Sequence, residues 1–210
     1  MKWKSLIGCL GLLIFFLFIP LVYSAEDRPF TESVIIFNTI CAKCHEAQCS
    51  GRLSFDDSYN KSTAHMLRYY AQASGKQGLQ KELFNILHYM KAKCAYYPMK
   101  ASVPIKKIWE EEVLVKFMTM IKRNYFIPVG NFSPGLYRIK LELDEDVKVS
   151  VNFISGKFDM IIDECYQSKE RQINITTHIE EPGEYYFRMY PREAVSLIRL
   201  EITQIDNEAK

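Results

Sequence analysis

Cys41-Ala42-Lys43-Cys44-His45 is the stretch of sequence that decides the fold predicted for this chain. Two thiols three residues apart, followed at once by an imidazole, form the pattern through which a c-type haem is attached. The thiols form thioethers with the porphyrin, and the adjacent histidine binds the iron. A structural zinc site would need a second, closely spaced pair of ligands. The pentapeptide therefore favours one covalent haem c, with Cys41 and Cys44 as its anchors and His45 as the proximal iron ligand.

The first 24 residues have the composition of a secretory signal peptide. Lys2 and Lys4 precede an apolar run over residues 6–22, and a small residue, Ser24, stands at the expected cleavage site. We therefore expect export to the periplasm or an equivalent compartment, with no membrane attachment after cleavage. Thioether-bound haem and disulfides both belong to such compartments. Because the apolar run approaches spanning length, a retained membrane anchor is the alternative.

Charge divides the mature chain into two halves. Residues 25–125 carry 15 Lys and Arg against 10 Asp and Glu, whereas residues 126–210 carry 10 against 15. Neither imbalance is large enough to indicate nucleic-acid binding, and no basic tract is interleaved with aromatic residues. The change in sign favours two domains with these bounds.

The spacing of apolar residues predicts helices in the first half. One apolar stripe leads into the pentapeptide, a second covers residues 79–93 with Cys94 as its next inward-facing member, and a third covers residues 104–123. The third helix is expected to bury Trp109 and Phe117. A short helix capped by Ser62 is expected between the first two.

The second half changes to the alternation that is typical of β-strands. Six segments have this pattern: residues 136–143, 147–155, 158–163, 171–178, 184–190 and 195–205. Their short, even spacing favours an antiparallel sandwich or small barrel. The predicted fold class is α+β, a helical haem domain followed by a small antiparallel β-sandwich, with the hinge at residues 124–133.

Residues 30–124, with the pentapeptide near their start, resemble the class I cytochromes c. That family usually takes its distal iron ligand from a methionine before the last helix, and Met99 in Tyr97-Pro98-Met99 stands at such a place. Cys94, in Lys93-Cys94-Ala95, instead resembles the thiolate-ligated, low-potential NaxLS-type cytochromes of anaerobic ammonium oxidisers. The second half, with Pro182-Gly183 before the aromatic run 185–187, is similar to the pre-peptidase C-terminal type of β-sandwich.

The distal iron ligand is the least determined part of the predicted site. Cys94 is the first choice because it continues an apolar stripe, and Met99 is the alternative. His65 or His88 could also serve, or the position could be open. An anionic thiolate lowers the potential of the iron, whereas a methionine raises it.

The cysteine count bears on the same choice. The mature chain has an odd number of cysteines. If Cys94 binds iron, Cys49 and Cys165 can form a disulfide. A disulfide between Cys94 and Cys49 would instead leave Cys165 alone.

These resemblances imply an exported monohaem cytochrome that carries electrons or serves as a subunit of a redox complex, rather than an enzyme. The implied partner is a redox protein, such as a second cytochrome subunit in a heterodimer. The alternative function is a gas-binding (NO or CO) or catalytic haem protein with a labile distal ligand.

Overall fold

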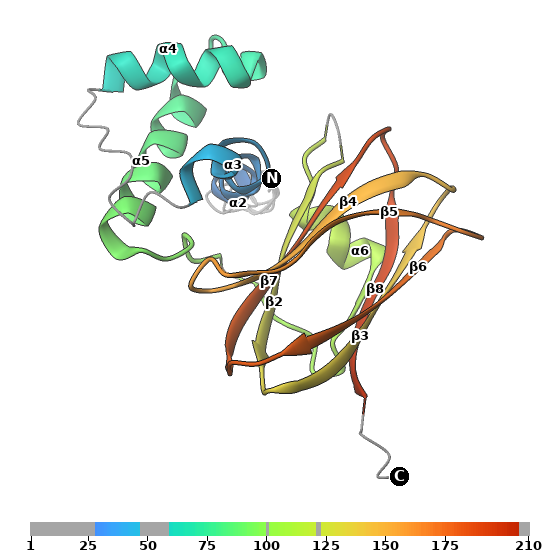
Figure 1. The fold of residues 1–210 in the computed structure, drawn as a ribbon. Coiled ribbons are helices and arrows are strands. Elements are labelled where there is room, and N and C mark those ends of the chain that lie inside the picture. The colour runs from blue at the N-terminus through green and yellow to red at the C-terminus, as the bar shows by residue number, and fades with distance from the viewer. Residues whose placement is uncertain (1–27, 47–58, 100, 121–122, 206–210) are drawn as a thin grey trace, which may run out of the picture.

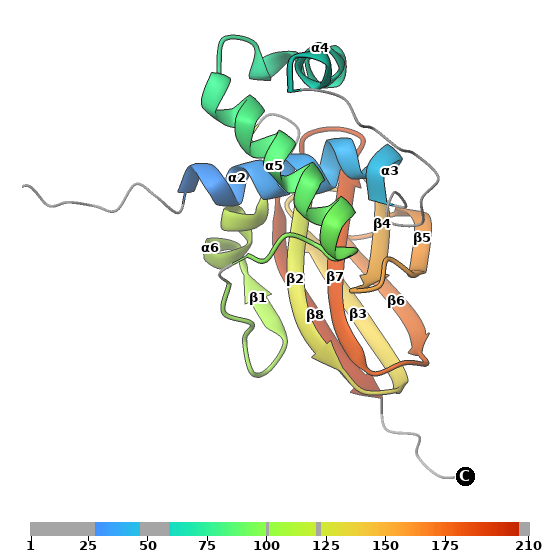
Figure 2. The ribbon, with the colours of Figure 1, turned by 90° about the vertical axis from the view of Figure 1, so that its left-hand side faces the viewer.

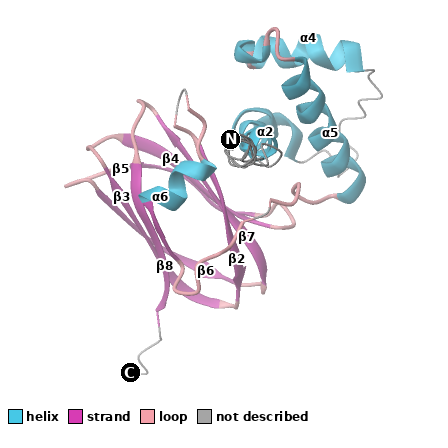
Figure 3. Cartoon of the chain, turned by 180° about the vertical axis from the view of Figure 1, so that it is seen from behind, coloured by secondary structure: helices cyan, strands magenta, loops and turns pink. Residues whose placement is uncertain are grey.

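The computed structural model describes residues 28–46, 59–99, 101–120 and 123–205. Two antiparallel sheets of four strands each stack face to face, and helices cover the outer face of one of them (Figures 1 and 3). The described helices include none long and apolar enough to cross a membrane. The expected signal peptide, residues 1–24, lies outside the described residues.

The strands follow a simple antiparallel scheme. One sheet has the order β1 (Ile108–Glu110), β8 (Leu197–Ile205), β3 (Gly135–Leu143) and β6 (Gln172–Ile179). The other has the order β2 (Tyr125–Phe132), β7 (Gly183–Pro191), β4 (Lys148–Ser155) and β5 (Met160–Gln167). Strands β3 to β8 confirm the six strands predicted from the alternation of the sequence.

The first part of the chain is helical. Its elements are α2 (Arg28–Ile36), the π-helical turn η2 (Phe37–Cys41), α3 (Ala42–His45), α4 (Tyr59–Tyr69), the short η4 (Ala71–Ala73) and α5 (Gln77–Lys93). We call this set the helical layer. Figure 2 shows α2 and α3 lying across the sheet that contains β2 and β7, with α5 and α4 outside them. The helices expected before the pentapeptide and over residues 79–93 are therefore confirmed. A helix also forms between them, but Ser62 lies inside α4 and does not cap it.

Burial along the strands explains this layering. In β3 buried and more exposed residues alternate, which is typical of a strand with one face in water. In β7 the five residues Tyr185 to Met189 are all buried. Successive side chains of a strand point to opposite faces, so both faces of this sheet must be covered. One face packs in the sandwich and the other supports the helical layer.

Helix α2 is buried on nearly every side. Residues 33–39 are all buried, including the polar Asn38 and Thr39. Asn38 donates to the carbonyl of Val34 at 2.9 Å, and Thr39 donates to that of Ile35 at 2.8 Å. These bonds to the chain's own backbone satisfy the Asn38 amide N–H and the Thr39 hydroxyl, which would otherwise be costly to bury, whereas the Asn38 side-chain oxygen has no hydrogen-bond partner among the described residues. A helix that is buried all round belongs to the interior of a fold rather than to its surface.

The predicted fold class, a helical domain followed by a separate β-sandwich, is wrong. The described chain is mainly a β-sandwich of two antiparallel sheets with a few short helices, and one continuous apolar core joins the helices to the strands. The physical reason is that α2 has no core of its own to enter. It packs against α5 and η5, and the turn η2 that continues it packs against β2.

The helix predicted over residues 104–123 is also wrong. These residues form β1, the single turn α6 (Glu111–Leu114) and the 3₁₀ turn η5 (Val115–Phe117). Trp109 and Phe117 are buried as expected, but in the sandwich, where Trp109 pairs with Leu200 of β8. Pairing with β8 supplies the backbone hydrogen bonds that a helix would have made internally.

Strand β2 falls in the segment that we expected to be a hinge. Its sequence contains Pro128 and Gly130, which usually indicate a turn. The structure accommodates both at an irregularity in the pairing with β7, where Gly130 has a φ of +81°. Glycine is suited to that conformation because it has no Cβ.

If residues 104–123 belong to the sandwich core, Trp109→Ala should lower the free energy of unfolding by about 3–5 kcal/mol, since Trp109 is only 1% exposed. Ile105→Ala is the matched control because Ile105 is fully exposed, and it should change stability by less than about 0.5 kcal/mol. Urea unfolding followed by circular dichroism measures both. Equal effects from the two substitutions would contradict the assignment.

Candidate functional site

The pentapeptide contributes to an apolar cavity of about 130 Å³ within the helical layer. Cys41, Cys44 and His45 lie on the wall formed by η2 and α3, and His65 of α4 lies on the cavity wall as well. Most of the other lining side chains are apolar: Phe37, Ile40, Met66, Leu83, Phe84 and Leu87. The structure therefore brings together the three residues that the sequence predicted as one site. We call this space the motif cavity.

A π-helical turn orients the pentapeptide. The backbone N–H of Ala42 donates to the carbonyl of Phe37, five residues earlier, instead of four as in an α-helix. One extra residue rotates the following helix by about 100° relative to α2. Phe37 and Cys41 thus line the cavity together, while α2 keeps its contacts with α5 and η5.

Two histidines meet in the motif cavity. The ring centroids of His45 and His65 are 5.8 Å apart, and the ring planes are inclined by 80°. His45 is buried, with 8% of its surface exposed, whereas His65 is exposed. The ring of Tyr69, one turn further along α4, lies 4.9 Å from that of His65. One imidazole is therefore enclosed by protein and the other lies at the open side of the cavity.

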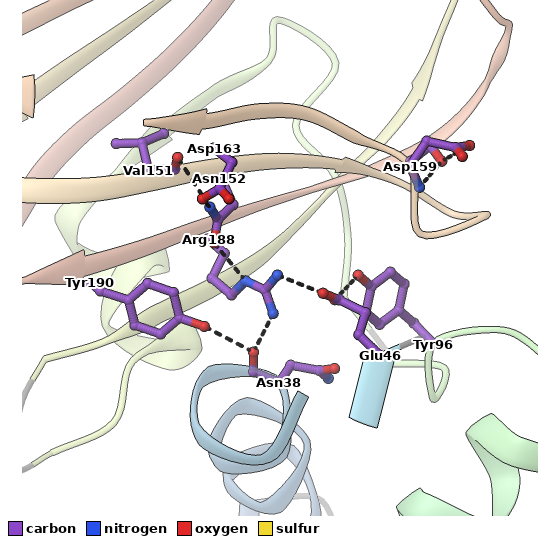
Figure 4. A network of polar contacts seen from close by, with 10 residues as sticks. Asn38, Glu46, Tyr96, Val151, Asn152, Asp159, Asp163, Arg188 and Tyr190 are labelled. Carbon is purple, nitrogen blue, oxygen red and sulfur yellow. Dashed lines mark hydrogen bonds and ion pairs between the residues drawn. The ribbon is translucent and has the colours of Figure 1, made fainter. Parts of the chain in front are cut away.

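A buried ion pair joins the end of the pentapeptide to the sheet (Figure 4). Arg188 of β7 is 2% exposed and donates to the carboxylate of Glu46 at 2.9 Å. It also donates to the backbone carbonyl of Asn38 at 2.8 Å and to the side chain of Asn152 at 3.2 Å. Because Glu46 directly follows His45, these bonds fix the position of the pentapeptide relative to β7.

Tyr96 completes this network from the segment after α5. Its hydroxyl donates to Glu46, and its ring contacts those of Phe126 and Tyr186. Burial, and then the charge of the Glu46 carboxylate, raise the pKa of Tyr96 well above its usual range. Tyr96 thus remains a neutral hydrogen-bond donor. The carboxylate of Glu46 is held by a cation on one oxygen and by a phenol on the other.

The two thiols of the pentapeptide differ in their surroundings. Both are free, Cys41 being partly buried and Cys44 exposed. Burial, and then the proximity of Cys44, raise the pKa of Cys41 to about 12. The Cys41 thiol is therefore protonated and weakly nucleophilic at neutral pH.

Comparisons with known proteins find no matching protein family and no matching curated protein. Among solved structures, the C-terminal CBM6 of LamC from Zobellia galactanivorans is similar, with a TM-score of 0.31 and 18% identity over 39% of this chain and 72% of that one. A family 35 carbohydrate-binding module from Clostridium thermocellum gives a TM-score of 0.30 and 10% identity over 39% of this chain and 70% of that one. Because these TM-scores are below 0.5, we transfer no ligand from these modules to this chain.

These findings correct the family and the function expected from the sequence. The assignment to class I cytochromes c of the NaxLS type is wrong, since the described chain is mainly a β-sandwich of two four-stranded antiparallel sheets. The likeness of the second half to pre-peptidase C-terminal sandwiches has no matching family. The functions that rested on the family, an electron carrier or redox subunit and its gas-binding or catalytic alternative, are withdrawn with it.

The structure does not bring Cys94 or Met99 to the pentapeptide. Neither residue lines the motif cavity, and Cys94 is disulfide-bonded and exposed. The reason is local. Helix α5 ends at Lys93, and Cys94 adopts a left-handed conformation with φ of 51°, which takes it out of the register of the apolar stripe. The prediction of Cys94 as a thiolate ligand is therefore wrong, because a sulfur in a disulfide carries no thiolate.

The predicted disulfide between Cys49 and Cys165 is also wrong. Cys165 has a free thiol and is exposed on β5. Cys49 lies outside the described residues.

Sequence reasoning gave little weight to two residues that now matter. His65 shares a helical face with Ser62, Met66 and Tyr69, all of which line the cavity, and that spacing is visible in the sequence. Arg188 is a charged residue inside an otherwise apolar strand segment. A charge in such a run indicates a buried partner, although it does not say which one.

Arg188→Met should lower the free energy of unfolding by about 3 kcal/mol, because it leaves the mostly buried carboxylate of Glu46, 12% exposed, without its cation. The double variant Arg188→Met/Glu46→Gln should lose less free energy of unfolding than the two single variants lose in sum, since it no longer contains an uncompensated charge. Lys157→Met removes the exposed pair of Lys157 with Glu181 and should have no measurable effect. Strict additivity of the two buried changes in urea unfolding would show that the pair is not coupled.

The high pKa of Cys41 predicts slow alkylation. In folded protein produced without the leader, so that no cofactor is attached, Cys41 should react with iodoacetamide more slowly than the exposed Cys165 at pH 8, and its rate should still be rising at pH 11. Peptide mass spectrometry reads each site separately. In denaturant the two cysteines should react alike, and similar rates in the folded protein would contradict the burial of Cys41.

Proposed function

We propose that this chain is a cofactor-binding β-sandwich protein whose helical layer holds one haem c, attached through Cys41 and Cys44 and bound at the iron by His45. The observation that carries the proposal is that these three side chains line one apolar cavity. Both thiols are free for thioether formation. The pentapeptide has the order and spacing that covalent attachment needs.

The lining of the motif cavity suits a largely apolar macrocycle. Phe37, Leu83, Phe84 and Leu87 offer hydrocarbon and aromatic surface. Small-molecule pockets usually occupy about 300–1,000 Å³, which is more than the volume of about 130 Å³ found here. A bound haem therefore requires α4 and α5 to lie further from α3. The exposure of Cys44 and His65 supports an opening on that side.

A dithiol redox pair is the competing use of a Cys-x-x-Cys motif. Thiol–disulfide exchange depends on an accessible thiolate of lowered pKa. Burial acts in the opposite direction on Cys41, whose pKa is raised to about 12. This argues against Cys41 as the attacking thiolate of a dithiol pair.

The cofactor proposal does not depend on the withdrawn family. Covalent attachment needs the pentapeptide and a cavity beside it, and both are features of this chain. The group would supply an iron centre whose axial ligands come from the protein. Export to a non-cytoplasmic compartment and the existence of a protein partner stay predictions.

Intact-mass measurement tests the proposal. The chain with its leader, produced in a bacterial host that attaches c-type haem in the periplasm, should carry the mass of one haem. A thiol adds across a porphyrin vinyl group with no change of mass, so Cys41→Ser and Cys44→Ser should each still carry the mass of one haem through the remaining thioether, whereas the double variant should lose the covalent haem entirely. Cys165→Ser is the matched control, because this exposed thiol is far from the pentapeptide in sequence, and it should keep the haem. Wild-type chain that is exported and folded but carries no haem would overturn the proposal.

A further inference from the structure

We infer that His65 is the second axial ligand of this haem, so that the iron is held between two imidazoles, His45 from α3 and His65 from α4. This inference rests on the proposed function. It differs from the first two choices made from the sequence, Cys94 and Met99, and selects His65 from the remaining alternatives.

The geometry of the motif cavity carries the inference. The ring of His65 is 5.8 Å from that of His45, and the two come from different helices that both line the cavity. Two metal–imidazole bonds of about 2 Å each, together with the size of the rings, place the ring centroids of a bis-imidazole centre about 6 Å apart. The distance found is close to this value. A small displacement of α4 would therefore suffice to place an iron between the rings.

The local setting of His65 suits a ligand. Its ring contacts that of Tyr69, which limits the directions in which the imidazole can turn. Neutral imidazole is a common iron ligand, and it needs no change of charge in an apolar cavity.

Other candidate ligands fit less well. Met66, the next residue of α4, lines the cavity but is 9% exposed and belongs to the apolar core. Its thioether is accounted for by packing. His88 is exposed on α5, where its ring contacts that of Phe84 with the planes inclined by 55°, and it does not line the cavity. His65 is thus the described residue with both a suitable donor atom and a position facing His45.

Spectroscopy of the purified haem-loaded protein tests the inference. Wild-type protein should show a six-coordinate, low-spin ferric spectrum by optical absorption and electron paramagnetic resonance. His65→Ala and the closer isostere His65→Gln should both keep the covalent haem mass but become high-spin. Added imidazole should restore the low-spin spectrum of His65→Ala. His88→Ala is the matched control and should leave the spectrum unchanged.

The possible outcomes separate this inference from the proposed function. Absence of haem from the wild-type chain overturns both. Haem that stays low-spin in both His65 variants overturns the His65 assignment alone. A sulfur-to-iron charge-transfer band in the wild type that disappears in Met66→Leu would assign the ligand to Met66 and would also overturn it.

Discussion

The buried guanidinium of Arg188 is the interaction on which the arrangement of this protein depends. A charged group that is 2% exposed is tolerated only when its N–H groups have partners, and an unpaired one costs several kcal/mol. Its partners come from two layers: Asn152 from the sheet, and Asn38 and Glu46 from either side of the pentapeptide. The distance and orientation between sheet and helices are therefore fixed where the helices carry His45. These hydrogen bonds therefore restrain the position of the pentapeptide relative to β7.

Both faces of the sheet under the helices are shielded from water, one inside the sandwich and the other by the helical layer. The helical layer is therefore part of the same fold. In β7, Tyr186 and Arg188 face the helices, where Tyr186 contacts Tyr96, while Tyr185 stacks on Phe153 inside the sandwich. Removing the helices would expose a row of aromatic side chains. A separate helical domain joined by a hinge would not cover these aromatic side chains. The site and the sandwich thus share one apolar core, and the stability of one supports the geometry of the other.

The sequence predicted the local features of this structure and missed those that depend on distant partners. Alternation identified β3 to β8. Cys41, Cys44 and His45 line one cavity, and their role in holding a haem stays a prediction. Helical spacing alone placed Cys94 inward, because it contains no information on the residue at which α5 ends in a left-handed conformation. Trp109 was correctly expected to be buried, but its partner Leu200 is 91 residues away, so the spacing could not show that it lies in a strand. The pairing of His65 with His45 is equally invisible, since it arises from how α4 packs.

The pentapeptide and Arg188, which binds the residues on either side of it, are far apart in sequence, so they are synthesised at different times. Arg188 follows Asn38 by 150 residues and Glu46 by 142. Domains acquire structure as their last elements become available, and a chain grows by about 5–20 residues per second. The thiols of Cys41 and Cys44 therefore emerge several seconds before β7 exists to receive the helix that carries them. The bonds from Arg188 to Asn38 and Glu46 are therefore among the last to form, and until β7 is made the pentapeptide is not anchored to the sheet.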